Sequence, residues 1–173
     1  METLWVEWDV AWLPRPNEAQ YILDGVLPPR DLITSAYGFL FDGDRFLMPR
    51  LVERGWDVPG GHAEPGETPL ETMQREVYEE TRVQLGPVGL LGYQKIIVHR
   101  AKPPGYRYPY PVSYQVFYWG QVAAKEPFVP TEEVADRRLF PPIKARRIAW
   151  VQRYLPLYEA ALEAATGRVA CEP

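Results

Sequence analysis

The chain has 173 residues, of which 46% are hydrophobic and 24% are charged, and these are ordinary values for one globular domain. A chain of this length buries about 70% of its unfolded surface, so it needs no disulfide or structural metal to fold. The formal net charge of −4 argues against a broad nucleic-acid footprint, which is usually basic. It does not exclude a small anionic substrate, because a local metal site can hold one.

The charged residues near the start and the low cysteine content predict a cytoplasmic protein. The first residues carry Glu2, Glu7 and Asp9 and no basic stretch, so we expect no signal peptide. No apolar run approaches the roughly 20 residues of a membrane span, so no membrane partner is expected. The single cysteine, Cys171, has no second thiol to pair with and is expected in a mobile tail at residues 167–173.

An alternating apolar pattern precedes the main domain. Every second residue is apolar at Leu4, Val6, Trp8, Val10 and Trp12. The pattern predicts a strand whose apolar face must be covered by the core or by a second copy of the chain. We therefore assign residues 1–32 to an N-terminal strand-containing extension and include a homodimer through it among the expected partners. The main domain is expected at residues 33–166.

Four apolar runs predict strands in the main domain, at residues 34–41, 45–51, 88–98 and 112–122. The first two flank Asp42, Gly43 and Asp44, which are typical of a hairpin turn. The last two flank a loop at residues 99–111 that is rich in proline and tyrosine. From Ile143 onward an apolar stripe predicts helix, which Pro156 interrupts or kinks and Gly167 ends.

The central helix has a well-defined predicted start. Thr68 suits the N-cap, Pro69 suits the first helical position, and Glu71 completes a capping box. An apolar stripe that is expected to face the core follows at Leu70, Met73 and Val77.

Three carboxylates lie on another side of this helix. Glu76, Glu79 and Glu80 stand at i, i+3 and i+4, so they project from one side and repel one another. They also lie in the C-terminal half of the helix, where the macrodipole disfavours anions. A cation between the carboxylates would remove both penalties, and oxygen ligands favour a hard ion such as Mg²⁺. A solvated acidic face is the alternative, and three glutamates alone would favour it.

The residues around this helix resemble the box of the Nudix hydrolase family. The pattern runs from residue 61 to residue 83 and is filled by Gly61, Glu67, Arg75, Glu76, Val77, Glu79, Glu80 and Val83. A looser likeness extends to most of residues 33–160. Arg82 stands where the box has a glycine that usually ends the helix in a left-handed turn. We therefore expect Arg82 to bear strain, or the helix to end differently.

The resemblance implies an α/β protein, an α/β/α sandwich with a mixed β-sheet. It also implies Mg²⁺-dependent hydrolysis of the diphosphate linkage of a nucleoside di- or triphosphate derivative, with Mn²⁺ as the alternative ion. The implied metal ligands are the carbonyl of Gly60 and the carboxylates of Glu76, Glu79 and Glu80.

Further roles in the reaction are implied by the same resemblance. Arg75 would orient the carboxylates. The general base would be Glu79 or Glu80 of the box, or Glu133 or its neighbour Glu132 on a later loop, and a surface-loop carboxylate is the alternative reading of Glu133.

Two further groups are candidates for substrate contacts. Arg50 and Arg54 precede the box and would contact phosphate, with solvated loop charges as the alternative. Tyr106, Tyr108 and Tyr110 alternate along the later loop and would stack on a base, with loop packing as the alternative. The expected partner is a small nucleotide-type molecule and not an extended nucleic acid.

Two other functions compete with hydrolysis. A Nudix-fold nucleotide sensor without catalysis would not need the full set of Arg75, Glu76, Glu79 and Glu80. An isoprenoid diphosphate isomerase shares the fold but would need a catalytic cysteine within the domain, and Cys171 lies near the end of the chain. Hydrolysis is therefore the leading hypothesis.

Overall fold

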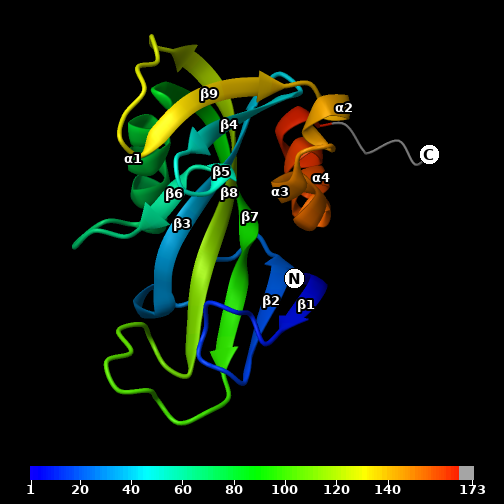
Figure 1. The fold of residues 1–173 in the computed structure, drawn as a ribbon. Coiled ribbons are helices and arrows are strands. Elements are labelled where there is room, and N and C mark those ends of the chain that lie inside the picture. Colours follow the sequence, from blue (N-terminus) through cyan, green and yellow to red (C-terminus); the bar gives the residue numbers. More distant parts are fainter. Residues whose placement is uncertain (168–173) are drawn as a thin grey trace.

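One mixed β-sheet forms the centre of the computed structural model, which describes residues 1–167 (Figure 1). In spatial order its strands are β1 (Glu2–Trp8), β2 (Asn17–Leu23), β7 (Val83–Val98), β8 (Val112–Lys125), β3 (Ile33–Asp42), β4 (Arg45–Leu51) and β5 (Gly55–Trp56). The short β6 (Gly60–His62) pairs with β3, and β9 (Val134–Phe140) pairs with β4. Strands β3 and β8 run parallel, whereas the other pairs among these residues are antiparallel.

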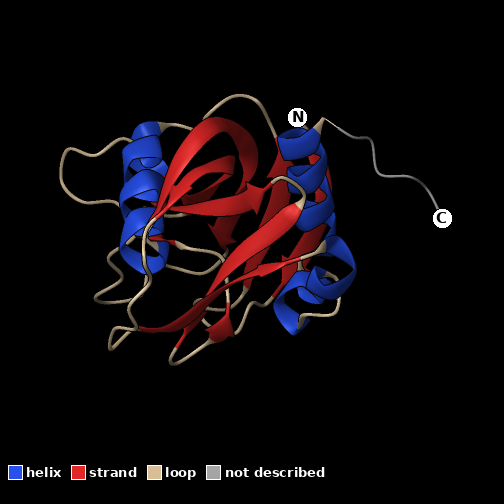
Figure 2. Cartoon of the chain, turned by 90° about the horizontal axis from the view of Figure 1, so that it is seen from above, coloured by secondary structure: helices blue, strands red, loops and turns tan. Residues whose placement is uncertain are grey.

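Helices cover both faces of this sheet. Helix α1 (Pro69–Thr81) lies on one face, and α3 (Ala149–Arg153) and α4 (Leu155–Thr166) lie on the other (Figure 2). A 3₁₀ turn (Arg30–Leu32) precedes β3, and the short α2 (Pro142–Ala145) follows β9. The predicted α/β/α sandwich with a mixed sheet is thus confirmed.

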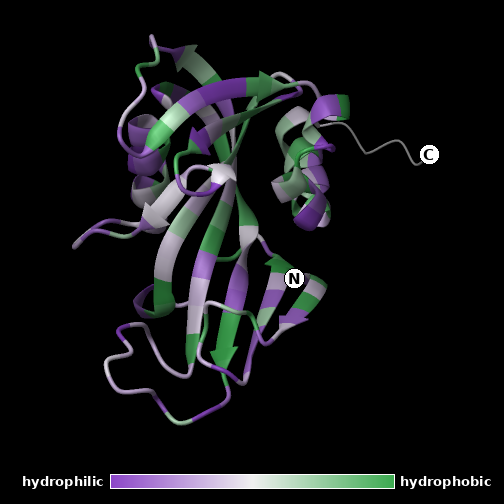
Figure 3. Ribbon diagram, viewed as in Figure 1, coloured by the Kyte–Doolittle hydropathy of each residue, from purple (hydrophilic) through white to green (hydrophobic). Residues whose placement is uncertain are grey.

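Two hydrophobic cores lie on opposite faces of the sheet, because successive side chains of a strand point to opposite faces. Phe39 and Phe41 of β3 pack with residues of α4, whereas Leu40 between them packs with Met73 and Val77 of α1. All five side chains are fully buried. Figure 3 shows bands of hydrophobic and hydrophilic residues along β1 and β2.

Helix α1 begins as predicted. Thr68 accepts a hydrogen bond from the Glu71 amide (3.2 Å), and the Glu71 carboxylate accepts one from the Thr68 amide (2.7 Å), which completes the capping box. Met73 and Val77 are buried, but the prediction for Leu70 was wrong, since 37% of its surface is exposed. Leu70 lies in the first turn at the margin of the buried face, whose residues are Pro69, Thr72, Met73, Val77 and Thr81.

The helix ends in a left-handed residue even though that residue is not glycine. Arg82 has φ 53° and ψ 39°, and its amide donates to the Tyr78 carbonyl (2.9 Å). Its guanidinium lies 5.2 Å from the centre of the Tyr78 ring. The side chain of Arg137, on β9, donates to the Thr81 carbonyl and so satisfies another acceptor at this end. The sequence left two outcomes open, a strained Arg82 or a different helix end, and the structure shows the strained Arg82.

The N-terminal segment forms a hairpin whose second strand was not predicted. Strand β2 pairs with β7, so the hairpin of β1 and β2 extends the central sheet. An irregularity between Thr3 and Trp5 changes the alternation of β1, and Trp5 stacks on Tyr21 at 4.0 Å between ring centroids. The expected apolar face is therefore largely exposed, as Trp8 (67%) shows. The homodimer through this segment stays a prediction.

The C-terminal helices follow the predicted stripe, which is broken into α3 and α4 at Tyr154, close to Pro156, as predicted. Pro156 lies in the first turn of α4, where a backbone N–H would have no partner within the helix. Proline lacks this N–H and is therefore accommodated at the start of the helix. Gly167 ends α4 in a left-handed conformation (φ 63°), as predicted. Cys171 and the rest of the predicted tail beyond residue 167 lie outside the described residues. Within the described part of the chain, no helix has the length and apolar character needed to cross a membrane.

Replacing Arg82 with glycine should stabilise the protein. The left-handed backbone costs an L-residue roughly 1–2 kcal/mol, and the greater freedom of glycine in the unfolded chain offsets part of this gain. We expect the melting temperature of Arg82→Gly to rise by roughly 1–4 °C in thermal unfolding. Arg82→Ala is the control: it keeps the strain and loses the contact with Tyr78, so its melting temperature should fall. Equal decreases in both variants would contradict this account.

Candidate active site

Two glycines let strand β6 pack closely against β3 on one side and α1 on the other. Gly60 has φ 155°, and a Cβ at this position would overlap the Ala36 carbonyl. A Cβ at Gly61 would overlap the Glu76 carboxylate. The amide of Gly60 also donates to Glu80 Oε2 (3.3 Å). The absence of a side chain at Gly61 therefore leaves room for Glu76, and Gly60 lets β6 lie close to β3 while its amide contacts Glu80.

Arg75 connects the loop before α1, strand β6 and the carboxylates of the helix. Its Nε and Nη2 donate to the two oxygens of Glu67 at 2.6 and 3.0 Å. Its Nη1 donates to Glu76 (2.9 Å) and to Glu79 (3.4 Å). Its Nη2 also donates to the carbonyl of His62 (3.1 Å). This guanidinium therefore fixes the relative positions of three segments.

Glu67 is the anionic partner that holds Arg75. Its Oε2 also accepts hydrogen bonds from the Glu64 amide and the Thr72 hydroxyl, both at 2.9 Å. The hydrogen bond from Arg75, together with the one from the Glu64 amide, lowers the pKa of Glu67 to about 2. Glu67 is therefore ionised at neutral pH and serves as a structural anchor.

Glu80 lies in a different environment from the other box carboxylates. Burial raises its pKa to about 8, and the negative charge of Glu76 adds to the shift. The hydrogen bond from the Gly60 amide and the positive charge of Arg54 lower the pKa, but less than burial raises it. Carboxyl groups whose pKa is raised by burial often occur at functional sites, where a bound cation can stabilise the ionised form.

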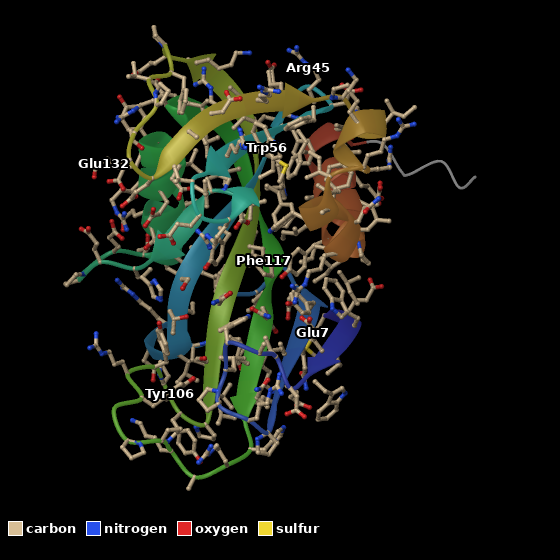
Figure 4. The ribbon with its side chains drawn as sticks, viewed as in Figure 1. Glu7, Arg45, Trp56, Tyr106, Phe117 and Glu132 are labelled. Carbon is tan, nitrogen blue, oxygen red and sulfur yellow. The ribbon has the colours of Figure 1, made fainter. Side chains whose placement is uncertain are left out.

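A second acidic segment faces the box helix. The loop before β9 supplies Glu132 and Glu133, which line one cavity of about 360 Å³ together with Glu76, Glu79 and Glu80. The Glu133 carbonyl accepts from the amide of Val52 (2.9 Å), which ties this loop to the end of β4. Figure 4 shows Glu132 beside α1. The structure thus brings Glu133 to the box, although its role stays a prediction.

The carboxylates have the donor chemistry of a site for a hard divalent cation. Five glutamates surround one cavity, and Arg75 contacts only two of them. In the described part of the chain, no three His, Cys, Asp or Glu side chains converge into a ready coordination shell. Arg75 draws Glu76 and Glu79 to itself, and Glu80 is turned toward the Gly60 amide. The donor atoms are carboxylate oxygens that line one cavity, so the residues fit such an ion in their chemistry.

A larger cavity of about 530 Å³ lies on the other side of β6. Aromatic side chains from several elements line it, among them Tyr37, Tyr106, Phe117, Trp150 and Tyr154. His62 of β6 also lines it, while Gly60 and Gly61 of the same strand lie against Glu80 and Glu76 of the acidic cavity, so β6 lies between the two cavities. Figure 4 shows Phe117 on the central strand β8 and Tyr106 on the loop below.

Some of the predicted substrate residues line these cavities and others do not. Arg54 and Tyr106 line the aromatic cavity, and Arg54 forms an ion pair with Asp57 (3.6 Å). Tyr108 lines it too, and its hydroxyl lies 3.2 Å from Nε2 of His62. Arg50 is exposed on β4 and is not among the residues that line either cavity. Arg54 and Tyr106 therefore line a cavity and Arg50 does not, and the substrate contacts of all three stay predictions.

Sequence reasoning missed several residues of the aromatic cavity. Gln94 and Gln115 are polar residues within the apolar runs that predict β7 and β8, and they lie opposite each other across these strands. Gln94 has only 3% of its surface exposed. A buried amide inside an apolar strand was the available signal, since such a group needs a polar partner. The contribution of Trp12 and Tyr21 from the N-terminal hairpin had no such signal.

The fold and the site together define an α/β/α protein whose box helix and a facing loop surround an acidic cavity. The family model described as "NUDIX domain" matches residues 31–161, which is more than half of the chain. The chain therefore belongs to the Nudix family.

Curated relatives match over parts of the chain. It is 43% identical over 61 residues to the "8-oxo-dGDP phosphatase NUDT18" of Mus musculus, a match that covers 33% of this chain and 19% of that protein. It is 30% identical over 121 residues to the "NAD-capped RNA hydrolase NudC" of Pseudomonas putida (strain W619), with 65% and 39% covered. The chain thus spans less than half the length of these two relatives.

A solved structure shows the same fold over most of the chain. The Bacillus subtilis pyrophosphohydrolase BsRppH aligns with a TM-score of 0.67 and 23% sequence identity, covering 89% of this chain and 94% of that one. At this identity the likeness supports the α/β/α architecture alone. Because residues 1–30 precede the segment that the family model matches, the β1–β2 hairpin lies outside that segment.

Glu67→Gln should destabilise the protein in a pH-dependent way. The pKa of Glu67 in the folded protein is about 2, below its ordinary value of 4.5, so its ionised form stabilises the fold above pH 4.5. That stabilisation is lost as the pH falls from 4.5 toward 2. Urea unfolding should therefore show Glu67→Gln less stable than the wild type at pH 7, with a smaller difference at pH 3.

Glu64→Gln is the matched control for this prediction. The side chain of Glu64 is exposed, and only its backbone amide contacts Glu67. Its stability should follow that of the wild type at both pH values. A difference for Glu67→Gln that is as large at pH 3 as at pH 7 would contradict the assignment of Glu67 as an ionised anchor.

Proposed function

We propose that the protein hydrolyses the diphosphate linkage of a nucleoside di- or triphosphate derivative and uses a divalent cation, Mg²⁺, to do so. The observation that carries the proposal is the single cavity lined by carboxylates of α1 and of the loop before β9. Family membership supports it, as do the names of two relatives, a phosphatase of 8-oxo-dGDP and a hydrolase of NAD-capped RNA. Both named substrates contain a phosphoanhydride.

The proposed ligands of the ion are the carboxylates of Glu76, Glu79 and Glu80 and the carbonyl of Gly60. When bound, Mg²⁺ (or Mn²⁺) neutralises the diphosphate and lowers the pKa of the attacking water. Arg75 holds two of these carboxylates in place from the outside of the cluster, through contacts of 2.9 and 3.4 Å.

The other residues of the site bind the substrate and move a proton. Arg54 is proposed to contact a phosphate oxygen, because it lines the aromatic cavity beside β6. Glu133 is proposed to accept the proton of the attacking water, which forms a new bond to phosphorus while the bond from phosphorus to the bridging oxygen breaks. Two phosphate-containing products result, and the leaving group carries the former bridging oxygen.

A nucleotide sensor without catalysis remains the competing function. The complete set of Arg75, Glu76, Glu79 and Glu80, joined by hydrogen bonds to the loop and to β6, favours hydrolysis. A protein that only binds nucleotide would gain little from holding uncompensated carboxylates beside its ligand. Turnover on a substrate panel separates the two functions.

The purified protein with Mg²⁺ should release a nucleoside monophosphate from at least one of a panel of nucleotides, nucleotide sugars and dinucleotides. Glu80→Gln should reduce this rate by ~100-fold or more, because it removes a proposed metal ligand. The exposed Glu64→Gln should keep the wild-type rate. Binding of panel members without any turnover would favour the sensor.

Glu133→Gln and Glu132→Gln form a matched pair that tests the general base. Loss of a positioned base typically reduces kcat by ~100-fold or more. We expect such a loss for Glu133→Gln and a loss below roughly 5-fold for Glu132→Gln, with little change in Mg²⁺ affinity for either variant. Near-normal turnover in both variants would instead assign the base to Glu79 or Glu80 of the box.

A further inference from the structure

The aromatic cavity has a wall from outside the segment that the family model matches. The loop between β1 and β2 contributes Trp12 and Leu13, and β2 contributes Tyr21. Each of these residues precedes residue 31, where the family match begins. Trp12 lines the cavity while 59% of its surface is exposed, so its ring has surface available to a ligand.

A buried amide holds this loop in one conformation. Asn17 has no exposed surface, and its Oδ1 accepts from the amide of Val10 (2.9 Å). Its Nδ2 donates to the carbonyls of Val10, Leu13 and Pro14 at 3.2, 3.4 and 3.3 Å. The carbonyls of Leu13 and Pro14 directly follow Trp12, so the backbone on either side of that residue is fixed. Such preorganisation lowers the entropy lost when a ligand binds against the loop.

The floor of the cavity carries a chain of hydrogen bonds that also begins in the hairpin. Arg153 donates to Glu7 of β1 (2.8 Å), and Glu7 accepts from the hydroxyl of Tyr21 (3.1 Å). The Tyr21 hydroxyl in turn accepts from Nε2 of Gln94 (2.7 Å). Because this chain engages Nε2, the oxygen of the Gln94 amide is the end left to accept from a ligand.

We propose that the N-terminal hairpin completes a nucleobase site, in which the base stacks against Trp12 and one of its N–H groups donates to Gln94. The inference rests on the proposed function, which places the diphosphate at the acidic cavity across β6. A cavity of about 530 Å³ with aromatic walls and a fixed amide has the size and chemistry for a planar ring with a polar edge. Base recognition is thereby assigned in part to residues outside the matched segment.

The test compares two exposed tryptophans of the same hairpin. Trp8 is 67% exposed, stacks on His99 (6.3 Å between ring centroids), and is not among the residues that line the cavity. Trp12→Ala and Trp8→Ala thus remove similar surface, one at the cavity and one away from it. The probes are the α,β-methylene analogues of ATP, GTP, CTP and UTP, with methylene diphosphonate as the probe that lacks a base. Kd is measured by calorimetry on the full chain with Mg²⁺.

Trp12→Ala should weaken binding of the preferred analogue by roughly 5- to 100-fold, the range that one base–aromatic stack contributes. Trp12→Phe should recover most of this loss, and Trp8→Ala should bind like the wild type. Binding of methylene diphosphonate should be the same in all four proteins. Equal weakening by Trp12→Ala and Trp8→Ala, or no weakening by either, would overturn the proposal.

Two outcomes separate this inference from the proposed function. Analogues that bind and lose affinity in Trp12→Ala, without turnover of any nucleotide by the wild type, would support the base site and reject hydrolysis. Turnover of a nucleotide whose affinity does not depend on its base would support hydrolysis and reject the base site.

Discussion

The guanidinium of Arg75 holds together helix α1, the loop before it and strand β6. It joins Glu67 of the loop before α1, the His62 carbonyl of β6, and two carboxylates of α1 through hydrogen bonds of 2.6 to 3.4 Å. None of these groups is fully buried, and arginine can serve all of them because its planar fork donates in several directions at once. A lysine at this position would lack the geometry to bind Glu67 through two oxygens and His62 together.

This interaction also explains why the acidic cluster is tolerated. Glu76 and Glu79 share the charge of Arg75, whereas Glu80 is buried beside Gly60 and has its pKa raised to about 8. One positive charge does not balance the five glutamates that line the cavity, so negative charge remains there. Arg75 thus stabilises the loop and the helix but does not neutralise all the carboxylates of the cavity. A cation could bind there, at the position where the diphosphate is proposed to bind.

The bounds of α1 were predictable from the sequence, because they depend on contacts between residues close in the chain. Thr68 and Glu71 cap the start of the helix, and Arg82 ends it. The meeting of Glu133 with the box depends on the pairing of β4 with β9, and only the resemblance to a family indicated it. The face of β1 was mispredicted because the irregularity before Trp5 shifts the alternation by one residue, and no local residue type announces such a shift. Gln94 was missed because its partner Tyr21 lies on a strand that the sequence did not predict.

The two cavities are built from different kinds of contact. The acidic cavity takes its side chains from one helix and one loop, and two of its carboxylates accept hydrogen bonds from Arg75. The aromatic cavity takes its side chains from the hairpin, the central strands, the loop at residues 99–111 and the C-terminal helices. Because β6 separates them, a substitution such as one at Trp12 alters the aromatic wall without touching the network of Arg75. Under the proposed function, the reacting group and the recognised group of a substrate would therefore be selected by separate sets of residues.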